Sequence, residues 1–381
     1  MRRPRDQRPS PGYPQGSDPP ALDLEQMSAS ALLAGYVADL ATGDPRRWHP
    51  VAGFGKAAAT LERATYAPSR LRGALVAGVL VAGAASVAEL AARATADIRS
   101  GRQAAFAAVT WAALGGRSLR RRAHDIATLI ERGELDRARC HLRALCGRDA
   151  AGLDAPGLCR AVVESVAENT SDAVVGALAW AAVAGPAGVA AYRAANTLDA
   201  MFGHRNERYT SFGWAAARLD DAMSWPAARL SAAIACAAAP LVGGRPTRTA
   251  AVIRRDGGAH PSPNAGRIEA AFAGALGVRL GGPLTYNTRP QTRASLGDGD
   301  LPGVDDIRRA ARLSLAVGTV AALLCAATRT LTLRAATRAR TLRATTPART
   351  LRATTRARTL HETPRKARTR ASSVPTRRGE R

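Results

Sequence analysis

The chain has 381 residues, of which 46% are hydrophobic and only 4% aromatic, a length that suits one large domain or two small ones. Much of its formal net charge of +25 lies at the end, where residues 329–381 hold sixteen Lys/Arg against Glu362 and Glu380. This uneven distribution argues against a uniformly basic nucleic-acid-binding surface. The five cysteines form no C-x-x-C pair, which argues against a zinc site or a disulfide framework.

Residues 1–26 begin with four arginines and continue as a Pro/Gly-rich stretch to Pro20. No apolar core follows at the distance expected in a signal peptide, so we predict a disordered extension that is not cleaved.

Uncharged or nearly uncharged segments recur along residues 27–328. They approach the roughly 20 apolar residues that cross a bilayer, and they lie at 73–90, 104–116, 173–192, 227–244 and 313–328. An alanine-rich soluble bundle remains an alternative, because alanine is near the insertion threshold. Four or five such segments nevertheless favour an all-α, polytopic integral membrane protein, with polar helical connectors such as residues 118–147.

The C-terminal residues 329–381 repeat a short motif. TLRA recurs at Thr332, Thr341 and Thr350, and TLHE follows at Thr359, without an apolar face that could bury a core. We interpret this segment as a disordered, low-complexity basic tail. It is either a repeat expansion without function or a segment whose arginines lie against anionic lipid headgroups or nucleic acid.

An acidic stripe precedes the apolar segment 173–192. Glu164, Glu168 and Asp172 are spaced four apart, so a helix would place them on one face, with Asn169 beside them. Adjacent carboxylates repel unless a cation neutralises them, and Mg²⁺ takes carboxylates together with substrate phosphates. A solvated helix face is the alternative, but no Lys/Arg interrupts this stripe, and ionisable groups at a membrane boundary are typically functional.

A second polar cluster spans Tyr192 to Asp221. Arginine forks suit phosphate and carboxylate partners, so this density of charge between two apolar segments favours a binding site over a surface salt-bridge network. The candidates here are Arg193, Asn196, Asp199, Arg205, Asn206, Arg218, Asp220 and Asp221.

Two shorter stretches complete the set of candidates. GDPRRWHPVAGFG at 43–55 contains Asp44 and His49, and HPSPNAGRIEAAFAGALGVRLGG at 260–282 contains Ser262, Asn264 and Glu269. Asn264 is a possible N-cap of a helix. Phosphate-binding, nucleophile-elbow and metalloprotease motifs are absent from the sequence.

The four stretches together, in this order, resemble the CobD/CbiB family of cobalamin biosynthesis proteins, the adenosylcobinamide-phosphate synthases. The resemblance covers about residues 30–328 and also includes the connector ERGELDRAR…GRDAAGLD at 131–154. The first 26 residues and the Arg/Thr-rich tail have no counterpart in that family, Ser224 stands where the family usually has Asn, and residues 287–301 look loose.

The resemblance implies a multi-pass cell-membrane enzyme of cobalamin synthesis. It would join adenosylcobyric acid to aminopropanol or its O-phosphate, with ATP as co-substrate and Mg²⁺ as metal. The implied partners are the corrinoid, the amine, membrane lipid and other late-step corrinoid enzymes, but no nucleic acid. The catalytic candidates are then Glu164, Glu168, Asp172, Asp220 and Asp221, with Glu168 and Asp172 as metal ligands, and the other residues named above bind substrate.

Two other functions stay open from the residues alone. A Mg-dependent membrane phosphotransferase would also use acidic stripes, although its usual D-x-x-D-G-x-x-A-R pattern is absent. A non-enzymatic corrinoid transporter or scaffold would carry charges inside its spans, whereas here they gather at segment ends.

The resemblance also implies that all four stretches share the cytoplasmic face. Segment 173–192 would then have to enter the membrane and return, and Gly185-Pro186 is the expected break, because proline cannot donate to the helix ladder.

Overall fold

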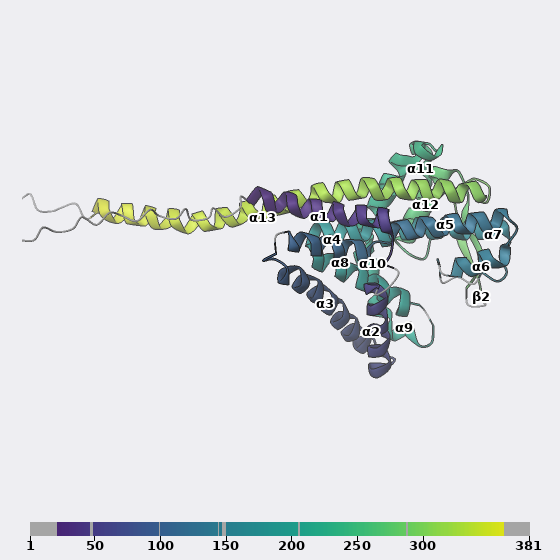
Figure 1. The fold of residues 1–381 in the computed structure, drawn as a ribbon, viewed down its shortest axis with the longest axis horizontal. Coiled ribbons are helices and arrows are strands. Elements are labelled where there is room, and N and C mark those ends of the chain that lie inside the picture. Colours follow the sequence, from purple (N-terminus) through teal and green to yellow (C-terminus); the bar gives the residue numbers. More distant parts are fainter. Residues whose placement is uncertain are drawn as a thin grey trace, which may run out of the picture. The chain divides into compact units, whose positions relative to one another are not determined.

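The computed structural model describes residues 21–45, 49–98, 100–143, 145–146, 150–204, 206–286 and 289–361, and these residues are almost entirely helical (Figure 1). In chain order, the first helices are α1 Ala21–Thr42, α2 Pro50–Thr65, α3 Arg70–Ala94, α4 Gly101–Ala113, α5 Gly116–Glu131, α6 Leu135–Arg143 and α7 Ala155–Thr170. They are followed by the π-helix η1 Ser171–Gly176, α8 Ala177–Phe202, α9 Tyr209–Phe212, α10 Trp214–Ala238, the 3₁₀ turn η2 Ala239–Val242, α11 Pro246–Asp256, α12 Ala265–Leu276, strands β1 Leu280–Tyr286 and β2 Arg289–Leu296, and α13 Val304–His361.

Four stretches among the described residues are long and apolar enough to cross a membrane. They are Arg70–Ala94, Ala155–Phe202, Trp214–Val242 and Val304–Ala339. The predicted all-α, polytopic membrane fold is thereby confirmed. The predicted segment 104–116 lies in α4, which with 13 residues is too short to be one of these spans.

The chain divides into two compact units, one up to Leu331 and the other from Thr332 onward. The second unit contains the predicted basic tail, whose described part is the C-terminal portion of α13. Residues 362–381 and the first 20 residues of the predicted N-terminal extension lie outside the described part of the chain, and α1 begins at Ala21.

The main core of the first unit is built from small side chains. Alanines and valines of α7, α8, α10, α12 and α13 pack together with larger anchors such as Leu32, Ile126 and Phe272. A smaller core joins α2 and α3 to α8, α9 and α10 around Phe202 and Phe212. The helix starts follow ordinary capping chemistry: Asp154 accepts from the N–H of Gly157 at the start of α7 (2.9 Å), where Pro156 occupies the first turn.

The apolar segment after Asp172 folds back on itself, as the sequence predicts. Gly185 breaks α8 with φ 60° and ψ −145°, directly before Pro186. A side-chain carbon added at Gly176 would lie 2.1 Å from the Tyr192 hydroxyl oxygen, so the two arms on either side of the break are in contact. A straight helix of this length would separate these two residues by about 24 Å.

A β-hairpin, β1–β2, follows α12 within this predominantly helical fold and includes part of the segment 287–301, where the resemblance to the family is loose. Strand signals in the sequence are weak, and here the strand pattern is broken by Gly281 and Gly282, which have φ values of 75° and 85° at a register shift. The hairpin is held by two buried side chains of α7: Arg160 donates to the carbonyl of Gly281 and Glu164 accepts from its N–H, both at 2.7 Å.

Candidate functional site

Asp172 lies at the start of an irregular helical turn. The last turn of α7 runs into the π-helix Ser171–Gly176, a wider turn that is found in proteins mostly at functional sites. Asp172 is half-buried there, and Glu168, one turn earlier, is exposed. The acidic stripe therefore emerges from the core at the point where the helix geometry changes.

The fold-back at Gly185 brings the second polar cluster beside this turn. Tyr192, which is fully buried, places its hydroxyl 3.2 Å from Ser224 Oγ of α10. Ser224 in turn lies 3.4 Å from Asp220 Oδ1, so the residue that departs from the usual family pattern is part of a polar network.

The same network continues along α8. Asn196 donates to Asp220 Oδ1 at 3.2 Å, and Arg193 donates to Asn196 Oδ1 at 3.1 Å. The Arg193 Nε atom is buried and makes no hydrogen bond within the described residues. Asn196 thus holds Arg193 in orientation, while the Nε–H of Arg193 is available to a ligand.

Carboxylates from three separate stretches of sequence converge around Arg193. Asp172 and Asp220 lie within electrostatic range of it, and so does Asp44 from the loop after α1. Asp172 also lies within range of Glu168 and Asp199. Several carboxylates thus surround one guanidinium, and a bound cation would relieve the repulsion among them.

Asp44 is placed by the start of α5. Its N–H donates to Ser118 Oγ at 3.1 Å, and its buried Oδ1 makes no hydrogen bond within the described residues. One turn earlier, the buried Asp39 accepts from the N–H of Arg117 at 3.2 Å. The pKa of Asp39 is raised to about 6, chiefly by burial and in smaller part by the charge of Asp44, whereas the N–H groups of Arg117 and Gly116 and the charge of Arg120 oppose the shift.

The acidic cluster suits a magnesium ion that is shared with a nucleotide. Among the described residues, no group of three or more His, Cys, Asp or Glu side chains forms a ready-made metal site. Mg²⁺ is, however, commonly held by one or two carboxylates plus substrate phosphates. The unpaired Asp44 Oδ1 and the neighbouring Asp172 are donors of that kind.

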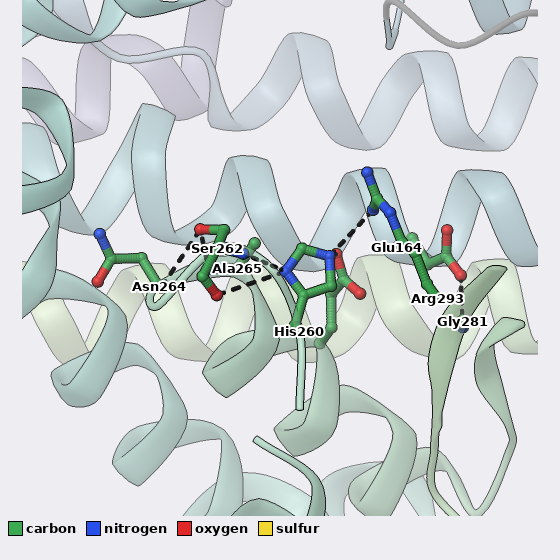
Figure 2. A network of polar contacts seen from close by, with 8 residues as sticks. Glu164, His260, Ser262, Asn264, Ala265, Gly281 and Arg293 are labelled. Atoms are coloured by element: carbon green, nitrogen blue, oxygen red, sulfur yellow. Dashed lines mark hydrogen bonds and ion pairs between the residues drawn. The ribbon is translucent and has the colours of Figure 1, made fainter. Parts of the chain in front are cut away.

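The loop before α12 adds a second group of polar residues, of which Figure 2 shows Ser262 and Asn264. The Asn264 amide donates to the carbonyl of Asp221 at 2.8 Å, and Arg229 donates to Asn264 Oδ1 at 3.2 Å. Asn264 stands at the N-cap position of α12, but its side chain does not cap the helix. Ser262 Oγ accepts from the N–H groups of Asn264 and Ala265 instead, at 3.3 and 3.1 Å.

Glu164 and Glu269 lie close to the hairpin β1–β2. Figure 2 shows Glu164 beside Gly281, whose backbone N–H donates to the Glu164 carboxylate. The first carboxylate of the predicted stripe therefore contacts β1. Glu269 is buried with Oε1 3.9 Å from His260 Nε2. The same ring nitrogen lies 3.0 Å from Arg293 Nη1 of β2, and His260 Nδ1 accepts from the N–H of Ser262 at 3.0 Å.

Several residues that we predicted to bind substrate form contacts within their own segment of the chain. His49 accepts from the N–H of Val51 at the start of α2 (3.2 Å), and Asn206 caps α9 by accepting from Tyr209 (2.8 Å). Asn169 donates to the carbonyl of Ser165 at 2.9 Å. Arg218 is exposed and lies 4.0 Å from Asp221, while Arg205 falls outside the described residues.

Some residues of these networks were not among the candidates. Tyr192, His260 and Arg293 are joined to them, and so are Arg160 and Asp39. His260 was visible in the sequence as the first residue of the Pro-rich turn. Arg293 gave no signal, because its strand was not predicted.

Comparisons with known proteins show which family the chain resembles. The model of the family described as CobD/Cbib protein matches residues 32–314. A protein named cobalamin biosynthesis protein CobD from Mycobacterium tuberculosis is 51% identical over 299 residues, which are 78% of this chain and 95% of that protein.

More distant bacteria have relatives of the same name. The protein from Chromobacterium violaceum is 41% identical over 75% of this chain and 92% of its own length. The protein from Rhodobacter capsulatus is 39% identical over 77% of this chain and 98% of its own length. The comparison with solved structures gives no significant match. On the extent and order of these matches, the chain belongs to the CobD/CbiB family of cobalamin biosynthesis proteins.

Proposed function

We propose that the protein is an adenosylcobinamide-phosphate synthase, which forms an amide between the free carboxylate of adenosylcobyric acid and aminopropanol or its O-phosphate at the expense of ATP. The observation that carries the proposal is the convergence of Asp44, Asp172 and Asp220 on Arg193 in a chain of this family. The site is proposed to open to the cytoplasmic face of the cell membrane, where ATP is available.

The chemistry requires activation of a poor acylating group. Transfer of the γ-phosphoryl group of ATP to the corrinoid carboxylate gives an acyl phosphate and ADP. Attack by the neutral amine then forms the C–N bond, one proton leaves the nitrogen, and inorganic phosphate departs. No protein nucleophile is needed in either step.

The residues of the cluster have distinct parts in this proposal. Asp172 and Asp44 would hold magnesium, which neutralises the nucleotide phosphates when it is bound. Arg193, fixed by Asn196, would orient the carboxylate or phosphoryl oxygens through its Nε–H. Asp220, held by Asn196, would accept the proton from the attacking amine. The polar loop with Ser262 and Asn264 borders Asp221 and suits the amide-rich rim of the corrinoid.

The proposal is tested in a bacterial strain that lacks this step. The chain should restore growth on cobyric acid, and a strain with or without it should grow on cobinamide. With the purified protein in detergent, amide product and ADP should appear in equal amounts when adenosylcobyric acid, amine, ATP and Mg²⁺ are all present. Rescue of growth without any ATP consumption would support the transporter alternative instead. A phosphorylated product without an amide would support the phosphotransferase alternative.

A further inference from the structure

A large apolar cavity lies between α2, α3, α4 and α8 and reaches the acidic cluster at Arg193. Its volume is about 740 Å³, and most of its wall is formed by side chains such as Leu80, Val109 and Val189. Of the polar groups among its described lining residues, the Trp111 N–H donates to Gly43 O at 3.0 Å and Thr197 Oγ donates to Arg193 O at 2.7 Å. The guanidinium of Arg193 belongs to the lining at one end, where the cavity meets the acidic cluster. Along the rest of the wall, a polar metabolite would lose its hydration without compensation.

The cavity opens along α3. Val79 and Val87 line it, yet they are 65% and 69% exposed. Figure 1 shows α3 slanting away from α4 and α8 over part of its length. Because α3 has the length and composition of a membrane span, the open side of the cavity faces hydrocarbon.

One end of the cavity is basic. Ala88 and Ala91 line it in the last turns of α3, next to Glu89 and Arg93. Arg93 Nε lies 2.9 Å from Glu89 Oε1, and Arg102 Nη2 of α4 lies 3.7 Å from the same oxygen.

A third guanidinium, that of Arg329 on α13, lies within electrostatic range of Glu89 and Arg102. Three arginines thus share one carboxylate, so this end has an excess of positive charge. The opposite end, at Arg193, adjoins the carboxylates of Asp44, Asp172 and Asp220.

We propose that this cavity binds an acyl chain of an anionic membrane phospholipid, with the lipid phosphate at Arg93, Arg102 and Arg329. The apolar wall matches the hydrocarbon chain, and the arginine forks match the phosphate oxygens. At the far end, Arg193 is the single cation among the described lining residues and is surrounded by carboxylates, whereas three arginines share one carboxylate at this end, so the charges favour this orientation of the lipid. The proposal does not rest on the proposed function, although Arg193 borders both sites.

The test is native mass spectrometry of the full chain in detergent, titrated with dioleoylphosphatidylglycerol or dioleoylphosphatidylcholine. Gly83 lines the cavity, and a Cβ atom added there meets nothing within 4 Å, so Gly83→Phe is chosen to place a ring in the cavity. This variant should lose at least about tenfold in lipid occupancy, because the acyl chain loses its buried apolar contacts. Gly78→Phe is the matched control: it makes the same change on the same helix, also in open space, at a residue that does not line the cavity.

The headgroup is tested separately with Arg102→Gln, which should lower the preference for phosphatidylglycerol over phosphatidylcholine about fivefold. Arg72→Gln, at the other end of α3, should leave that preference unchanged. Equal lipid occupancy in Gly83→Phe, Gly78→Phe and the unchanged chain would overturn the proposal, as would an equal loss in both glycine variants. A preference for phosphatidylglycerol that survives in Arg102→Gln would overturn the placement of the phosphate.

Discussion

Asp172 is the carboxylate whose surroundings differ most from those of an ordinary helix face. It occupies a π-helical turn and shares the field of Glu168, Asp199 and Asp220. Asp172→Asn keeps the shape of the side chain but removes its charge, so amide formation should fall by about 100-fold or more, on the scale of lost electrostatic stabilisation in other active sites. The rate is measured as amide product formed by the purified protein.

The matched control for this change is Asp125→Asn, an exposed carboxylate on α5. Both variants should accumulate in membranes and melt within a few degrees of the unchanged protein. Normal amidation by Asp172→Asn would remove this residue from the proposed metal site.

Gly176 is constrained by a close contact with Tyr192. A Cβ atom at this position would lie 2.1 Å from the Tyr192 hydroxyl and 2.2 Å from its Cζ atom, and the tyrosine has no room to move because it is fully buried. Gly176→Ala should therefore lower the free energy of unfolding by about 1–3 kcal/mol through overpacking. Thermal unfolding in detergent measures the loss, and Gly53→Ala, at a helical glycine with open space around it, should not show it.

Asp39 should make stability depend on pH in the acid range. Its folded-state pKa, about 6, lies above the ordinary 3.8, so the folded protein binds this proton more tightly than the unfolded chain. The free energy of unfolding should therefore fall as pH rises from about 4 to 6, by roughly 2 kcal/mol from this residue, and then level off. Thermal unfolding of Asp39→Asn should lack this contribution and exceed the stability of the unchanged chain at pH 8. A parallel pH profile for both proteins would contradict the assignment.

At the residue scale, the sequence predicted the types of residue that gather around Arg193 more accurately than it predicted which individual side chains lie there. Asp44, Asp172, Arg193 and Asp220, chosen from three separate stretches, come together in the structure, and their chemical roles remain predictions. His49 was a predicted ligand but caps α2. A side chain that binds the next turn of its own helix has the same sequence pattern as one that binds a substrate, so contacts of this kind could not be told apart.

At the scale of elements, the break in α8 decides which residues meet. Without a reversal at Gly185, Arg193 would lie about 30 Å from Asp172 along a straight helix. The sequence indicated this reversal through Gly185-Pro186, since both residues disrupt helices. It did not indicate the hairpin β1–β2, because the contacts that fix it come from α7, more than a hundred residues earlier.

Gly185→Ala should disturb both the fold and the reaction. The backbone at φ 60° and ψ −145° is accessible almost only to glycine, and a Cβ atom would also lie 3.0 Å from Arg329 Nη2. We expect a loss of about 1–3 kcal/mol in unfolding free energy and a fall in amidation, because the two arms no longer hold Asp172 beside Arg193.

Unfolding and amidation are measured on the same detergent preparations. Gly78→Ala on α3, which meets no neighbour, is the control and should change neither quantity. Unchanged amidation in Gly185→Ala would show that the reversal does not position the site.

At the scale of the whole molecule, length and hydropathy were sufficient to predict a polytopic helical membrane protein, because crossing a bilayer requires long apolar helices. Length and hydropathy were not sufficient to predict how many times the chain crosses the membrane. The stretch Ala155–Phe202 is long enough for one span, but its two arms run back along each other.

The C-terminal repeats should be dispensable, whereas the residues just before them should not. A chain that ends after Arg334 keeps every described contact of Arg329 and should restore growth on cobyric acid. A chain that ends after Thr328 loses the bonds from Arg329 to Ser28 Oγ (3.0 Å) and Ala182 O (3.4 Å), and it should be degraded or inactive. Growth is scored beside the amount of protein in membranes. Loss of growth with normal accumulation of the longer truncation would show that the repeats bind something the reaction needs.

The contact between Arg329 and the turn in α8 can form only late in the synthesis of the chain. Arg329 supplies a cation to the carbonyl of Ala182 at the turn between the two arms, and it stacks 5.7 Å from the Phe106 ring. The arms are synthesised first, and at ordinary ribosome speeds Arg329 follows on the order of ten seconds later. During this interval the turn lies in the bilayer without its cation, so a nascent chain that stalls before Arg329 is the form that membrane proteases should remove first.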